Sequence, residues 1–226
     1  MANNFFNAIK TSVSADSTLP TAVYTTPNGL KSILIELDVA NKSSSGVTVT
    51  VQICDASANS SGTGNAHTAS AIATNTTGTL TTAAAHGLLV NDRVTFTAGG
   101  APSFTDASLP PSGDTVLSLT TTTARIYYVQ SVGAGASPTT FTIAESESAT
   151  SPLTFDTNGS SVTMTRIYLA DIVRDAPVPV GGSLKVISGQ KLVLESSSAT
   201  VQDKVFVTSS AANAVDAIGS VLQEVS

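Results

Sequence analysis

The stretch Ala176–Val207, APVPVGGSLKVISGQKLVLESSSATVQDKVFV, carries the clearest structural signal in the chain. Pro177 and Pro179 disfavour helix, and Gly181 with Gly182 supplies a turn. Short runs of alternating apolar residues follow, separated by Gly, Ser and Asp: Leu184 and Val186, Leu192 and Leu194, Val205 and Val207. Three strands in about thirty residues are typical of an antiparallel β-sandwich.

Two earlier runs show the same period of two. Ser32–Ala40 is predicted as a half-buried strand, with Ile33, Ile35, Leu37 and Val39 on one face and Leu34, Glu36 and Asp38 on the other. Val47–Cys54 repeats the alternation, with its threonines and Gln52 directed outward. The polar residues Asn41–Gly46 between the two runs predict a turn, so the two strands are expected to form a hairpin.

The tail predicts one more strand. Val215, Ala217, Gly219 and Val221 share one parity, and Asp216, Ile218, Ser220 and Leu222 share the other. Because this run is long, we expect the strand to be paired on both sides.

The middle of the chain, residues 55–164, has a different sequence pattern from the two ends. Residues 55–78 contain few large apolar side chains before Ile72, which indicates a long loop or crossing segment. Residues 79–164 contain short strands at close spacing with turn residues between them, which predicts a small barrel or mini-sandwich. The expected organisation is an all-β chain: a discontinuous, jelly-roll-like antiparallel β-sandwich from residues 1–78 and 165–226, with residues 79–164 as an inserted β-module.

Composition favours a chain that assembles. Charged residues make up only 12% of the 226 residues, so threonine and serine must fill most exposed strand positions. Uncharged strand surfaces are cheaper to desolvate against a neighbouring subunit than surfaces rich in Lys and Glu. The net charge of −6 and the lack of a Lys/Arg cluster disfavour nucleic-acid binding. No stretch approaches the ~20 apolar residues of a membrane span, and the first residues do not resemble a signal peptide, so we expect synthesis and use in a cytoplasm.

The N-terminal segment 1–14 is predicted as a short arm. Phe5, Phe6, Ile9 and Val13 have a spacing that one face of a helix could share, and a first strand is equally compatible. The rings of two adjacent phenylalanines are expected to be buried against other apolar side chains. They either close one end of the domain core or dock on a neighbouring subunit, so these four residues are the candidate assembly residues.

No catalytic, cofactor or metal site is predicted. The chain has one cysteine, Cys54, which ends an apolar run and is expected to be buried. Only His67 and His86 could serve a Ser/His/Asp triad, and neither lies in a Gly-x-Ser-x-Gly turn. His86 precedes a glycine, so its ring is expected to hydrogen-bond the local backbone. Candidate glycosidase carboxylates in the insert have no tryptophan beside them and are interpreted as loop carboxylates: Asp92, Asp106, Asp114, Glu145, Glu147 and Asp156.

Two sets of motifs resemble known phage proteins. AHGLLVNDRVTFT (85–97), YYVQSV (127–132), TTFTIAES (139–146) and LTFDTNGS (153–160) resemble a repeat of tail, fibre and capsid-associated proteins of tailed bacteriophages. In that repeat a Gly-Asp pair opens the strand, whereas this chain has Asn91-Asp92. VYTTPNGLKSILIELDVAN (23–41), VTVTVQICD (47–55), YLADIVRDAPVPVGGSLKV (168–186), GQKLVLESS (189–197) and VDAIGSVLQEVS (215–226) are similar to small structural proteins of marine and freshwater phages, including cyanophages.

The resemblance implies a non-enzymatic virion component assembled in the host cytoplasm. Its partners would be other virion proteins, either the major capsid protein or neck and tail proteins, and further copies of itself in a trimer or ring. The resemblance leaves open whether the subunit decorates or cements the head, joins head to tail, or lies on the tail. The alternative is a receptor- or glycan-binding module of the tail, which would contact host glycan through the loops 99–113 and 133–138.

Overall fold

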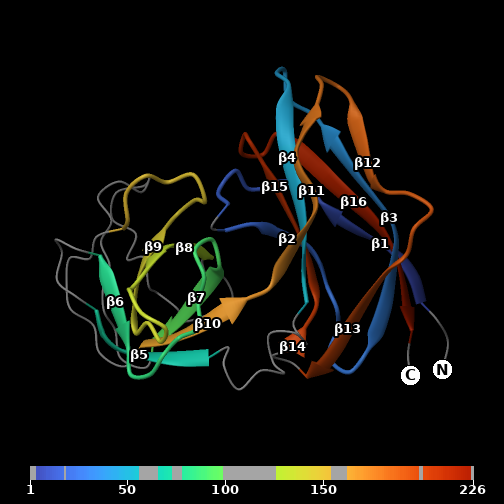
Figure 1. The fold of residues 1–226 in the computed structure, drawn as a ribbon. Helices are drawn as coiled ribbons and strands as arrows, with labels where there is room; N and C mark the ends of the chain where they lie inside the picture. The colour runs from blue at the N-terminus through green and yellow to red at the C-terminus, as the bar shows by residue number, and fades with distance from the viewer. Residues whose placement is uncertain are drawn as a thin grey trace. The chain divides into compact units, whose positions relative to one another are not determined.

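The chain folds into two all-β units in the computed structural model, which describes residues 4–17, 19–55, 66–72, 78–98, 126–153, 162–198 and 201–224. Within these residues all regular secondary structure is β-strand, and every strand pair is antiparallel. One unit comprises residues 1–61 and 168–226, and the other comprises residues 62–167 (Figure 1).

The first unit is a sandwich of two sheets. The first sheet has the order β1 (Asn4–Lys10), β16 (Val215–Glu224), β3 (Lys31–Asn41), β13 (Leu192–Ser198) and β14 (Val201–Gln202), with β12 (Ser183–Ile187) also paired to β3. The second sheet has the order β11 (Leu169–Val178), β4 (Val47–Cys54), β15 (Lys204–Ser209) and β2 (Thr21–Thr25). The three strands predicted from the opening stretch are confirmed as β12, β13 and β15. The tail strand is confirmed as β16, paired with both β1 and β3.

One apolar core lies between the two sheets. Alternate side chains of the central strands are buried in it, including Leu34 and Val39 of the first sheet and Val49 and Val207 of the second. A polar contact also crosses the core, because the Tyr24 hydroxyl of β2 lies 2.7 Å from the Ser32 Oγ of β3. Each hydroxyl is therefore satisfied where both side chains are buried.

The Tyr24 phenol makes the stability of the sandwich sensitive to alkaline pH. Burial raises the pKa of Tyr24 above its ordinary value, while the hydrogen bond with Ser32 acts in the opposite direction. Below about pH 10 the phenol is neutral in both states. Above that, the unfolded chain loses the proton first, so unfolding is favoured as pH rises. We expect the free energy of unfolding of Tyr24→Phe to fall less steeply than that of the wild type between about pH 9.5 and 11.5, measured by urea unfolding. Parallel curves would contradict this.

The predicted hairpin of β3 and β4 is wrong. The two strands belong to different sheets, and the residues between them cross from one sheet to the other. Strict alternation shows that one face of each strand is buried but does not identify its neighbour. Five or six residues are enough to cross the ~10 Å between packed sheets, so a polar turn of this length is compatible with either arrangement.

Asn41 fixes this corner. Its Nδ2 donates toward the carbonyl oxygens of Ser45 (2.8 Å), Val178 (3.1 Å) and Pro179 (3.2 Å). Its Oδ1 accepts hydrogen bonds from the backbone N–H and the hydroxyl of Ser43. Val178 ends β11, and Pro179 begins another crossing, from β11 to β12. One buried amide therefore ties together two of the places where the chain changes sheets.

The predicted assignment of β3 side chains to the two faces is wrong for the residues before Ile35, because the strand contains a β-bulge there. Ser220 of β16 is opposite Glu36 and Val221 is opposite Leu34, so Ile35 has no partner in this register. An extra residue on one strand reverses the in–out parity on its two sides. Leu37 and Val39 point into the core as predicted, but Leu34 does so too, and Ile33 lies on the outer face.

The second unit is a closed six-stranded barrel. Its order is β10 (Val162–Ile167), β5 (Ala66–Ile72), β6 (Thr79–Thr82), β9 (Thr140–Ala144), β8 (Tyr127–Val132) and β7 (Arg93–Ala98). Its buried apolar residues are Leu80, Leu88, Val94, Tyr127, Val129, Phe141, Ile143 and Met164. The predicted fold class, an antiparallel β-sandwich with a small β-module, is confirmed.

The barrel takes in part of the segment expected to be a loop. β5 lies within residues 55–78 and pairs with both β6 and β10, so the prediction of one long loop there is wrong. Its sequence AHTASAI has only one large aliphatic side chain, which gives too weak an alternation to reveal a strand. The second unit accordingly begins near residue 62 and ends at Ile167, whereas the sequence suggests boundaries at 78/79 and 164/165.

Candidate assembly surface

Phe5, Phe6 and Ile9 of the candidate assembly residues lie on the strand β1 and not on a helix, and Val13 follows that strand. β1 pairs with β16 over its whole length, from Asn4 opposite Gln223 to Lys10 opposite Ala217. In a strand, alternate residues face opposite sides. Phe5 and Ile9 are exposed on the outer face of the sheet, whereas Phe6 packs against the core and Val13 is fully buried in it. The four therefore do not form one surface.

The N-terminal segment is part of the sandwich and not a free arm. Phe6 contacts Tyr24 of the opposite sheet, with ring centroids 6.1 Å apart. Backbone N–H groups of Ser209 and Asn213 donate to the carbonyl oxygens of Ser14 and Val13. Removal of residues 1–13 would take away both Phe6 and a core valine, so we expect it to destabilise the sandwich as well as remove the exposed residues.

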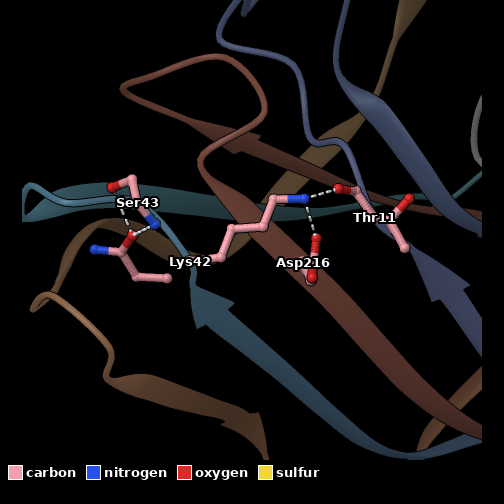
Figure 2. Close-up of polar contacts among 5 residues, drawn as sticks. Thr11, Lys42, Ser43 and Asp216 are labelled. Carbon is pink, nitrogen blue, oxygen red and sulfur yellow. Dashed lines mark hydrogen bonds and ion pairs between the residues drawn. The ribbon is translucent and has the colours of Figure 1, made fainter.

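A lysine holds the end of this segment beside the two central strands. The Lys42 Nζ contacts the carbonyl oxygen of Thr11 and forms an ion pair with Asp216 of β16, 2.6 Å from its Oδ1 (Figure 2). Lys42 follows β3, so its two contacts link the end of β3 to β16 and to the residue Thr11 that follows β1. β1 is thereby presented in a fixed position.

A row of four apolar side chains crosses the outer face of the first sheet. Phe5 of β1 is opposite Leu222 of β16, Leu222 is opposite Ile33 of β3, and Ile33 is opposite Val193 of β13. Directly opposite residues lie on the same face with Cβ atoms about 5 Å apart. Phe5 is 62% exposed and Val193 is 54% exposed, while the middle two are half-buried. We call these four residues the outer row.

The outer side of β1 and of the facing residues 218–222 of β16 carries no charge. Ile9 is opposite Ile218, and both side chains are exposed, at 55% and 42%. Between this pair and the outer row, Asn7 is opposite Ser220, whose hydroxyl donates to the Asn7 Oδ1 at 3.4 Å. The outer surface of β1 and its neighbour is thus apolar with one uncharged polar pair.

Only the part of this outer surface that lies on β1 is predictable from the sequence. Phe5 and Ile9 were identified from their apolar character on a terminal segment. Ile33 was assigned to the core because the bulge at Ile35 is invisible to a strict period of two. The alternation of β16 did place Leu222 and Ile218 on the face opposite Val221, but without the strand order it could not align them with Phe5.

His86 has a structural role, as predicted. Its ring is buried, and the Leu88 N–H donates to Nδ1 at 3.0 Å. Nδ1 is therefore an acceptor, so Nε2 carries the proton and donates to the carbonyl oxygen of Thr140 at 3.1 Å. The ring also packs edge-on against Phe141, at 5.2 Å between centroids. With both nitrogens used by the backbone, His86 is not positioned as a base or a metal ligand.

The Asn91-Asp92 pair closes the turn before β7. Asn91 has a φ of 72°, in the left-handed region that favours glycine and that asparagine tolerates best among other residues. The exchange of glycine for asparagine at this place is therefore conformationally conservative. Asp92 accepts from the Leu89 N–H and forms an ion pair with Arg166, both at 2.7 Å. This carboxylate is engaged in holding the turn.

The structure offers no other candidate centre within the residues it describes. In those residues no group of three or more His, Cys, Asp or Glu side chains could hold a metal ion. The same part of the chain contains no helix long and apolar enough to cross a membrane. Cys54 is buried, as predicted. The described residues do not include the loop 99–113 or the carboxylates Asp106, Asp114 and Asp156. The backbone of His67 is described, but its side chain is not.

Comparisons with known proteins return only distant likenesses. No protein-family model and no curated protein sequence matches the chain. The chain is similar to the VP16-VP17 complex of bacteriophage P23-77, a complex of its two major capsid proteins, with 7% identity over 99% of both chains and a TM-score of 0.20. It is also similar to the VP2 subviral particle of infectious bursal disease virus, with 9% identity over 98% of this chain and 40% of that chain, and a TM-score of 0.12. Scores this low do not indicate a shared fold.

Proposed function

We propose that the chain is a non-enzymatic structural subunit of a tailed-phage virion, which docks on the particle through the outer face of its sandwich. The observation that carries the proposal is the outer row, Phe5, Leu222, Ile33 and Val193, which places apolar side chains in register across four strands on an exposed face. The ion pairs Lys31–Glu195 and Glu36–Lys185 lie on either side of the row, and an apolar patch rimmed by polar residues marks an interaction site. The phage assignment rests on the resemblance of the sequence motifs.

The mechanism is repeated weak docking. Removing the outer row from water would contribute roughly 25 cal/mol per Å2 of apolar area buried. One such patch gives modest affinity, because association also costs translational and rotational freedom. Many copies on a symmetric particle multiply the effect through avidity, which is how a small decorating or cementing subunit reaches full occupancy. The partner would be a major capsid, neck or tail protein.

The adhesion alternative has less support. In the part of the chain that the structure describes, the loop Gly133–Pro138 is the candidate glycan surface, and its sequence GAGASP has neither an aromatic side chain to stack on sugar nor a charge. The other candidate loop, 99–113, is outside the described residues. The outer row therefore favours docking on protein.

The test is incorporation into particles. We expect Val193→Lys to lower the copy number of the chain in gradient-purified particles by about tenfold or more, because a lysine cannot be buried in an apolar contact without a partner. Copy number is measured by quantitative mass spectrometry of the particles, and particle position by cryo-electron microscopy. Since Val193 is more than half exposed, the variant chain should fold normally.

A matched control uses the other unit. Leu89, at the turn before β7, is an exposed leucine of the barrel, 65% accessible, so Leu89→Lys makes the same kind of change away from the sandwich. We expect it to leave the copy number unchanged. Absence of the wild-type chain from particles would overturn the virion proposal. Equal losses for the two variants would overturn docking through the sandwich face.

A further inference from the structure

The edge strands of the sandwich, β1, β2, β11, β12 and β14, differ in how well they are protected against pairing with another chain. Natural sheets guard their edges with short strands, bulges, charges and prolines. β11 has two register shifts, a positive φ at Asp175, and Pro177 within the strand. β2 has five residues and a register shift, β12 has five residues, a register shift and the charge of Lys185, and β14 has two residues.

β1 is the least protected of these edges. It has seven residues, no proline, an unbroken register with β16, and a single charge, Lys10. Among the described residues it pairs with β16 alone, so the backbone groups on its other side are available to a further strand. A regular and partly apolar edge whose one charge lies at its end is a template for strand addition.

The sequence of β1, NFFNAIK, is complementary to itself about Asn7. In an antiparallel pair centred on that residue, Asn7 faces the Asn7 of the second copy and Phe5 faces its Ile9. On the inner side, Phe6 faces Ala8, a large side chain against a small one. Lys10 faces Asn4, so no like charges lie opposite one another. A strand of another protein would need a matching pattern, whereas a second copy supplies it by symmetry.

We propose that two copies of the chain pair through β1, antiparallel and centred on Asn7, to form a continuous sheet across a two-fold axis. The contact is isologous and therefore closes at two copies. It differs from the trimer or ring expected from the sequence, which would need a second, different edge. Because the two outer faces lie on the same side of the joined sheet, the pair would present both outer rows side by side.

The pairing adds detail to the proposed assembly role and rests on it. The pairing itself can be measured on the isolated full-length chain. We expect the wild type to have twice the 22.8 kDa of one chain by sedimentation equilibrium in the micromolar range. Asn7→Lys places two lysines opposite each other, and Asn7→Glu places two glutamates. Each change should raise the dimer dissociation constant by about tenfold or more. Mixing the two variants should restore the dimer, because unlike charges then face one another.

Two controls separate pairing from misfolding. Ser220→Lys puts the same charge on the same face one strand inward, opposite Asn7 of its own chain, and should leave the dissociation constant within about twofold. Asn7→Cys should cross-link the dimer on oxidation, since opposite Cα atoms lie within the ~4.4–6.8 Å range of a disulfide. Ile9→Cys should not, because the two copies of that residue are displaced from each other along the strands.

The outcomes are decisive in each direction. A monomeric or trimeric wild type, a failure of the mixed charge variants to restore the dimer, or cross-linking by Ile9→Cys in preference to Asn7→Cys would overturn the pairing. A monomer that is still incorporated into particles would overturn the pairing and leave the virion proposal intact. A dimer that is absent from particles would overturn the virion proposal and support the pairing.

Discussion

Replacing Phe141 with alanine is expected to lower the free energy of unfolding of the barrel by about 3–5 kcal/mol. Phe141 is among the largest fully buried side chains, lies opposite Leu80 of β6 and Val132 of β8, and packs against the His86 ring. Among the described residues Phe141 belongs to the closely packed core of the barrel, so neighbouring side chains have little freedom to fill the space that the ring leaves. The loss is a large part of the total stability of a small domain.

The same substitution tests whether the two units are separate domains, as we propose. Hydrogen exchange measured by mass spectrometry should then show faster exchange in peptides from residues 79–98 and 126–153 of the Phe141→Ala chain. Peptides from residues 31–54 and 204–224 should keep their wild-type protection. The control is Thr142→Ala on the same strand, which removes a half-exposed side chain and should cost about 1 kcal/mol or less. Equal loss of protection in both units would show that they unfold as one.

The sequence predicts the strands well because their signal is local. An alternation of apolar and polar residues follows from the geometry of a single strand, so β4, β15 and β16 could be recognised without knowing their partners. β5 was missed because its small side chains bury little area and leave no pattern. The structural role of His86 was also predictable, because the glycine after it indicates a turn.

What the sequence could not supply is the arrangement of strands relative to one another. The β3–β4 connection crosses between sheets, although its length and polarity also fit a hairpin. The bulge at Ile35 depends on the register against β16, a strand about 180 residues further along the chain. Since the outer row is aligned by strand order and by this bulge, only its Phe5 end could be proposed in advance. Surfaces made of side chains from four strands are invisible until the sheet is assembled.

Asn41 joins two of the sheet-to-sheet crossings, and Asn41→Asp is expected to cost about 3–5 kcal/mol at pH 7. The two side chains have nearly the same shape. The aspartate, however, would place a carboxylate oxygen within 2.8–3.2 Å of three carbonyl oxygens in a buried site. It would lose every donor of the native contact and add repulsion that nearby solvent does not screen. Asn28→Asp, in an exposed turn, is the matched control and should change stability by no more than about 0.5 kcal/mol.

The pH dependence separates this mechanism from a simple loss of packing. Both burial and the facing carbonyl oxygens raise the pKa of the new carboxyl above the ordinary value of about 3.9. A raised pKa in the folded state means that the folded chain retains the proton when the unfolded chain has released it, so stability falls as pH rises through and above that value. Below it the protonated acid can donate one hydrogen bond to a carbonyl, and part of the lost stability returns. We therefore expect the difference between Asn41→Asp and wild type, measured by urea unfolding, to shrink from pH 7 to pH 3. Asn41→Ala, which cannot titrate, should keep a constant deficit of about 2 kcal/mol over the same range. If the aspartate variant also shows a constant deficit, the three carbonyl oxygens are not the reason for its cost, and the corner is held by packing instead.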